Sequence, residues 1–128
     1  MSNALLVGFG GFLGSLLRYV LGGWVLRLKV GWTFPLETLV INVLGCLVFG
    51  LLAGLAESRG VLSGSARAFL FIGLLGGFTT FSSFGYETFQ LLRLGQGTMA
   101  VVSIGLQVVL GLAAMWGGHA LGAMGRWG

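Results

Sequence analysis

The sequence has few of the side chains that keep a soluble protein in water. Only 8% of its 128 residues are charged, whereas 56% are hydrophobic. A soluble domain of this size needs a polar surface, which so few charges cannot supply. The mean hydropathy of +1.00 agrees with this deficit. The composition therefore indicates a membrane protein.

Residues that carry most enzyme and metal chemistry are also scarce. Cysteine and histidine occur once each, as Cys46 and His119. A single cysteine excludes an intrachain disulfide, and without a Cys/His/carboxylate cluster no transition-metal site is supported. No nucleophile has a plausible base and orienting partner, so we expect no enzyme. The net charge of +4 comes from Lys and Arg residues scattered singly, and we expect no nucleic-acid partner.

Apolar segments are abundant. The ranges 3–26, 35–56, 66–92 and 98–121 each reach the roughly 20 residues needed to cross a bilayer. The connections are too short for a soluble domain. We therefore predict an all-α membrane protein in which residues 1–128 form a single four-helix transmembrane domain. The N-terminus lacks a basic n-region and an evident cleavage site, so we expect range 3–26 to be a span and not a removed signal peptide.

The third segment contains an unusual stretch, GLLGGFTTFSSF at 73–84, with adjacent glycines and four hydroxyl side chains. Lipid cannot hydrogen-bond an unwound backbone, so such a stretch belongs where protein or a hydrated cavity covers it. Helices broken at membrane depth are where transporters bind ions. The segment is also longer than a straight span needs, and we predict a break near the Gly76-Gly77 pair.

Small and polar residues recur at spacings of three and four in the other segments, so each set shares one helical face. The sets are Gly8, Gly11, Ser15, Arg18 and Gly22; Thr38, Asn42 and Gly45; and Ser103, Gln107, Gly111, Ala114 and Gly118. Tight helix packing explains such faces, and a narrow polar pathway would run along the same seams.

Three polar side chains inside the segments need partners. Asn42 lies well inside the second segment, where its amide requires either a protein partner or an ion. Arg18 either reaches the nearby interface or provides charge that neutralises a backbone site or attracts anions. Glu87, on the face of Thr80 and Ser83, is either a functional intramembrane carboxylate or part of a water-filled vestibule.

Two phenylalanines have a polar context. Phe81 and Phe84 are interleaved with the hydroxyl residues of 79–83. Aromatic ring edges are electropositive, so an anion could approach these edges and the hydroxyl donors together. Ordinary packing of the two rings is the other interpretation.

The basic residues at the segment ends give no preferred orientation. One side carries Arg59, Arg67 and Arg126, and the opposite side carries Arg27, Lys29 and Arg93. Because the counts are equal, the positive-inside rule does not predict which side faces the cytoplasm. Either other features decide the orientation, or the chain inserts both ways and pairs antiparallel.

Three motifs make the sequence resemble the Fluc (CrcB-type) family of small fluoride channels. They are GGFLGSLLRY at 10–19, TLVINVLG at 38–45 and GGFTTFSSF at 76–84. The resemblance covers all four segments, and the third motif is highly specific. It implies passive export of fluoride through the cell inner (plasma) membrane, which reduces internal fluoride. It also implies an antiparallel, dual-topology homodimer in lipid, with two pores at the interface.

The resemblance further implies roles for individual residues. A structural sodium ion, which is not transported, would be held by the backbone carbonyls of Gly76 and Thr79 from both subunits. Arg18 and Glu87 would have electrostatic or structural roles. The fluoride path would be lined by Asn42, Phe81, Phe84, Ser83 and Thr80 and by Ser103 and Gln107 of the last segment. Glu37 departs from the family, which often has Gly there, and gives the pore mouth an unusual charge.

Two other classes of protein fit parts of the sequence. A proton-coupled small multidrug transporter is also a four-span, dual-topology dimer, but it requires a carboxylate in the first span, where this chain has none. A non-transporting membrane scaffold fits the glycine-rich faces and gives no reason for the polar stretch at 76–83. Selective release of fluoride from liposomes would distinguish the three classes.

Overall fold

The computed structural model describes residues 2–29, 31 and 33–124, so Arg126 of the charge count lies outside the described residues. Four helical spans are long and apolar enough to cross a membrane, which confirms the predicted all-α membrane fold. The spans run over Asn3–Leu28, Leu36–Arg59, Gly64–Arg93 and Gly97–Ala123. The largest difference from prediction is at the end of the second span, which continues to Arg59 where we expected residue 56.

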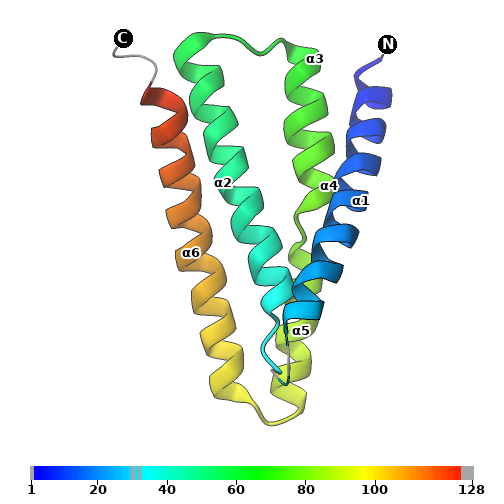
Figure 1. Cartoon of the computed structure of the whole chain (residues 1–128), viewed down its shortest axis with the longest axis vertical. Helices are drawn as coiled ribbons and strands as arrows, with labels where there is room; N and C mark the ends of the chain where they lie inside the picture. The colour runs from blue at the N-terminus through cyan, green and yellow to red at the C-terminus, as the bar shows by residue number, and fades with distance from the viewer. Residues whose placement is uncertain (1, 30, 32, 125–128) are drawn as a thin grey trace.

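The first, second and fourth spans are single helices, and the third span is divided into several helical segments. The single helices are α1 (Asn3–Leu28), α2 (Leu36–Arg59) and α6 (Gly97–Ala123). The third span consists of α3 (Gly64–Arg67), the π-helix η1 (Ala68–Leu75), α4 (Gly76–Phe78) and α5 (Phe81–Arg93). Successive spans alternate in direction, so the start of α1, the α2–α3 connection and the end of α6 lie at the same end of the molecule (Figure 1).

Glycines set how closely α2 and α6 approach. An added Cβ at Gly50 would collide with the Met115 carbonyl, and one at Gly118 would collide with the Leu47 carbonyl. Gly54 and Gly122 make contacts of the same kind one turn further along. Lipid provides no hydrophobic drive for helix association, so backbone-to-backbone contact of this kind supplies the packing energy. The glycine face predicted for the last span is therefore a packing face.

The third span breaks as predicted, and its extended residues are threonines. Thr79 (φ −82°, ψ 159°) and Thr80 (φ −149°, ψ 117°) leave the helix immediately after α4. Gly76 and Gly77 are still helical. Gly77 lies against α1, where an added Cβ would come within 2.6 Å of the Gly11 carbonyl. Gly77 thus allows close packing beside the break, and the β-branched threonines form the break itself.

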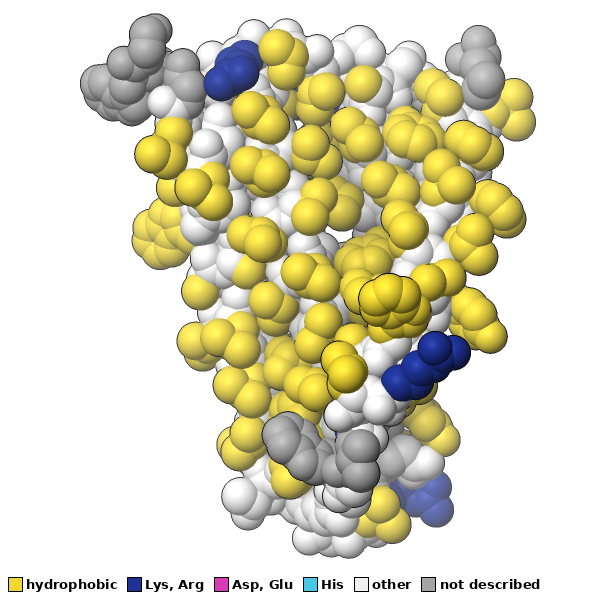
Figure 2. All heavy atoms as spheres, viewed as in Figure 1, with side chains coloured by type: hydrophobic (Ala, Val, Ile, Leu, Met, Phe, Trp, Pro, Cys, Tyr) yellow, Lys and Arg dark blue, Asp and Glu magenta, His cyan; other side chains and the backbone are white. Residues whose placement is uncertain are grey.

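Large apolar side chains cover much of the outer surface (Figure 2). Ile41 is 1% exposed, whereas Tyr19 and Trp116 are each 80% exposed. A surface of this kind is stable only against lipid or another protein chain. The described residues therefore form a bundle whose outer faces require an apolar environment.

Gly118→Ala should destabilise the α2–α6 contact, because the new methyl group would force two backbones apart. Overpacking of this kind costs about 1–3 kcal/mol in free energy of unfolding. Thermal denaturation in detergent, followed by circular dichroism, measures the effect. The matched control is Gly117→Ala, since nothing lies within 4 Å of a Cβ added there. Equal melting temperatures for the two variants would show that the glycine face does not control this contact.

Candidate functional site

The side-chain amide of Asn42 holds the extended turn of the third span. Its Oδ1 accepts a hydrogen bond from the Thr80 backbone N–H at 2.9 Å, and its Nδ2 donates to the Thr80 carbonyl at 2.9 Å. One amide therefore pairs with both backbone groups of a residue outside the helices, as a neighbouring β-strand would. Nδ2 also donates to Gln107 Oε1 at 3.2 Å, which connects α2 to α6. Asn42 thus has protein partners for its oxygen and its nitrogen.

The carbonyl oxygens of residues 76–79 lose their helical donors at this turn, because the N–H groups of residues 80–83 no longer bond to them. In an unbroken helix, the Thr80 N–H would bond the Gly76 carbonyl, and the Ser83 N–H would bond the Thr79 carbonyl. Here the Thr80 N–H donates to Asn42, and the Ser83 N–H donates to Thr80 Oγ1 at 3.2 Å. The carbonyls affected include those of Gly76 and Thr79, the pair that the sequence resemblance assigns to a cation.

Thr80 also caps the helix that follows the turn. Its hydroxyl accepts the Ser83 N–H bond and donates to Ser83 Oγ at 3.1 Å. An N-cap side chain of this kind satisfies one of the free N–H groups at a helix start. The first turn of α5 carries a partial positive charge, which favours a nearby anion.

Five of the residues predicted for the fluoride path line one cavity of about 390 Å³, which we call the phenylalanine cleft. They are Asn42, Thr80, Phe81, Phe84 and Gln107, and the cleft is also lined by Gly45, Cys46, Phe49, Thr79, Val108 and Met115. The Phe81 ring is 81% exposed, and its centroid lies 5.6 Å from that of Phe84 at an interplanar angle of 59°. The cleft therefore combines amide groups with two aromatic rings.

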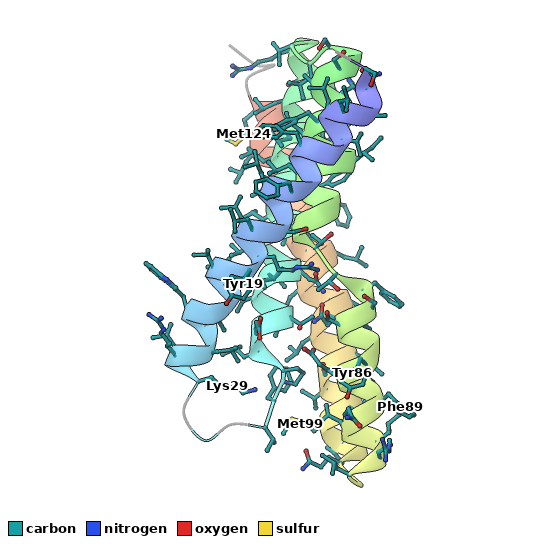
Figure 3. All side chains as sticks on the ribbon, turned by 90° about the vertical axis from the view of Figure 1, so that its right-hand side faces the viewer. Tyr19, Lys29, Tyr86, Phe89, Met99 and Met124 are labelled. Carbon is teal, nitrogen blue, oxygen red and sulfur yellow. The ribbon has the colours of Figure 1, made fainter. Side chains whose placement is uncertain are left out.

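A second cavity of about 860 Å³, the polar vestibule, lies on the other side of the Thr80 turn. Its polar lining comprises Ser15, Arg18, Arg27, Glu37, Thr38, Thr80, Ser83 and Glu87. Thr38 Oγ1 donates to Glu87 Oε1 at 2.6 Å, which joins α2 to α5. In Figure 3, α1 with Tyr19 and Lys29 diverges from α5 with Tyr86 at this end of the molecule. Thr80 lines both cavities and is the residue they share.

Ser103, the remaining residue predicted for the fluoride path, does not line either cavity. It is 1% exposed, and its hydroxyl has no hydrogen-bond partner among the described residues. The sequence did not indicate that Cys46 lines the phenylalanine cleft. It did not identify the Thr38–Glu87 bond either. The feature of the sequence that could have pointed to Thr38 is its spacing from Asn42, because the two residues lie one helical turn apart on the same face.

Thr80→Val should destabilise the start of α5, because valine keeps the shape of threonine without the capping oxygen. Loss of an N-cap costs about 0.5–2 kcal/mol in free energy of unfolding. Thr80→Ser is the matched control and should behave like the unmodified protein in thermal denaturation. If both variants melt at the wild-type temperature, the cap makes no contribution to stability.

The sequence of this chain is also similar to those of known proteins. Residues 5–119 match the protein family described as "CrcB-like protein, Camphor Resistance (CrcB)". The chain is 50% identical to the fluoride-specific ion channel FluC of Methylobacillus flagellatus over 121 residues, 94% of each chain. It is 44% identical to FluC of Nitratidesulfovibrio vulgaris over 124 residues, 97% of this chain and 99% of that one. The corresponding identity with FluC of Thermus thermophilus is 49% over 118 residues, covering 92% and 91%.

Proposed function

The chain belongs to the CrcB-like family, whose relatives named above are fluoride-specific ion channels, and we propose that it conducts fluoride selectively and passively. It is a multi-pass membrane protein and not an enzyme. In the cell inner (plasma) membrane, such a channel lets accumulated fluoride leave and so lowers its internal concentration. The observation that carries the proposal is the phenylalanine cleft, where a donor amide faces aromatic rings beside a broken helix.

Fluoride is small and strongly hydrated, so a selective pore has to replace its water with other donors. Gln107 lines the cleft, and its buried Nε2 has no hydrogen-bond partner among the described residues. Asn42 Nδ2 lies within 3.2 Å of Gln107 Oε1, so the two amides adjoin. The edges of Phe81 and Phe84 add electropositive hydrogens. An anion in the cleft would therefore meet amide and ring hydrogens together.

The polar vestibule provides the entrance in this proposal. Arg18 supplies positive charge there, and the hydroxyls of Thr80 and Ser83 form the step from vestibule to cleft. Glu87, held by Thr38, has an electrostatic role at the same position. Ser103 lies one helical turn before Gln107 on α6, and its unpartnered hydroxyl would extend the polar track along that helix. Each contact is weak enough alone for the ion to leave.

The proposed channel is an antiparallel, dual-topology homodimer with two pores at its interface. The 81% exposure of Phe81 supports a second copy, because a pore-lining ring has to be covered on its outer side. Gly76 is exposed as well, so the two broken helices can approach closely. The equal numbers of basic residues at the two ends of the spans favour insertion in both orientations.

A structural sodium ion fits the broken turn in this dimer. The carbonyls of Gly76 and Thr79 lack their helical donors, and free backbone oxygens are suitable ligands for a hard cation. Two subunits would each supply these two oxygens. When bound, the ion would neutralise carbonyl dipoles for which the described part of the chain supplies no donor, and it is not transported.

Asn42→Asp should abolish fluoride efflux from proteoliposomes, because it places a charged carboxylate oxygen where the Asn42 amide nitrogen donates to the Thr80 carbonyl and to Gln107 Oε1. A fluoride electrode measures the efflux, which should fall to the level of protein-free liposomes. Asn3→Asp makes the same chemical change at the start of α1, away from both cavities, and should keep the wild-type rate. Unchanged efflux from Asn42→Asp would remove this residue from the mechanism. Efflux equal for fluoride and chloride in the wild type would contradict selective conduction.

Sodium should raise the melting temperature of the purified protein if it binds at the turn. A ligand at 100 times its dissociation constant stabilises the native state by about 2.7 kcal/mol. The comparison uses sodium, potassium and N-methylglucamine chlorides at equal ionic strength, with the other conditions fixed. A melting temperature that is the same in all three salts would argue against the sodium site.

A further inference from the structure

Glu37 lies at the start of α2, where its side chain lines two adjoining cavities. One is the polar vestibule, and the other, of about 310 Å³, is also lined by Lys29, Tyr86, Gln90 and Gln96. Gly22 of α1 makes room for this side chain, because an added Cβ there would collide with the Glu37 carboxylate. The carboxylate is therefore placed at the end of the vestibule by the packing of α1 against α2.

The charge of Glu37 is not neutralised by a direct ion pair. Among the described residues, no Lys, Arg or His nitrogen lies within 4.0 Å of its carboxylate. The charged groups that face it across the two cavities are Arg18 and Arg27 of α1, Lys29 after α1, and Glu87 of α5. The cations among them therefore share the cavities with Glu37 without a direct ion pair to it.

The negative charge of Glu37 also counteracts the dipole of α2. Glu37 is in the first turn of α2, and Pro35 before it makes no side-chain capping bond. The free N–H groups of that turn carry partial positive charge, which would attract an anion to the vestibule. A carboxylate in the same turn cancels this attraction. Because a cavity with low-dielectric walls concentrates the field of its charges, one carboxylate changes the local anion concentration several-fold.

We infer that Glu37 limits the rate at which fluoride enters the pore, by repelling the anion at the end of the vestibule. The inference rests on the proposed function of the same site. Glu37 does not line the phenylalanine cleft, so its effect is on the supply of ions and not on the selective step. Neutral residues at this position should give a faster channel with unchanged selectivity.

The test is fluoride efflux from proteoliposomes with wild-type protein, Glu37→Gln and Glu37→Gly. At an ionic strength of about 10 mM, where the Debye length is about 30 Å, both neutral variants should be about two- to fivefold faster than wild type. At about 1 M N-methylglucamine isethionate, where the Debye length is about 3 Å, the difference should disappear. Two neutral side chains of different size separate an effect of charge from an effect of volume.

Two controls accompany the measurement. Glu37→Asp keeps the charge and should keep the wild-type rate. Glu57→Gln makes the same change in net charge at the other end of α2, where the carboxylate is hydrogen-bonded to His119 at 2.7 Å, and should not change the rate. Equal reconstitution of all variants is verified by the protein recovered in the liposomes.

The outcomes distinguish this inference from the proposed function. A low-salt gain in both neutral variants, lost at high salt, supports a role for the charge. Wild-type efflux without such a gain, or a gain that persists unchanged at high salt, would overturn the inference alone. No fluoride efflux from wild-type liposomes would overturn the proposed function and this inference with it.

Discussion

The two hydrogen bonds between the Asn42 amide and the Thr80 backbone are the interaction on which the rest of the site depends. Lipid offers no partner to an N–H or C=O group, and an unpaired group in hydrocarbon costs several kcal/mol. The third span can open at membrane depth only because another helix supplies a substitute. Asn42 supplies both a donor and an acceptor, so the turn can be extended while the N–H and C=O groups of Thr80 are both paired.

Several features follow from this one constraint. The diverted Thr80 N–H releases the Gly76 carbonyl, and the Thr80 hydroxyl, by capping α5, releases that of Thr79. A new helix then starts in the middle of the span and carries Phe81 and Phe84 into the cleft that Asn42 also lines. The released carbonyl oxygens and the placement of the two aromatic rings are therefore consequences of a single unwound turn. In our proposal, that turn is where a structural cation and a passing anion come closest together.

Much of the fold was predictable because hydropathy and length determine membrane spans. The existence of the break was predictable too, because the third segment is longer than a straight span needs and combines adjacent glycines with four hydroxyl side chains. The exact position of the break was harder to predict from the sequence. The Gly76-Gly77 pair indicated a break there, but Gly77 packs against Gly11, and the extended residues are the threonines that follow. The choice between a protein partner and an ion for Asn42 depended on tertiary contacts with Thr80 and Gln107, as did the placing of Ser103 outside both cavities. No feature noted in the sequence predicted the π-helix over Ala68–Leu75.

Hydrogen exchange at the Thr80 backbone amide, measured by NMR in lipid nanodiscs, tests the central claim most directly. The account predicts that this amide is protected in the wild-type protein although it lies outside every helix. Replacing Asn42 by alanine should speed its exchange about tenfold, which corresponds to about 1.4 kcal/mol of lost hydrogen bonding, while the buried Leu91 of α5 exchanges as before. Equal exchange of the Thr80 amide in the two proteins would contradict the account.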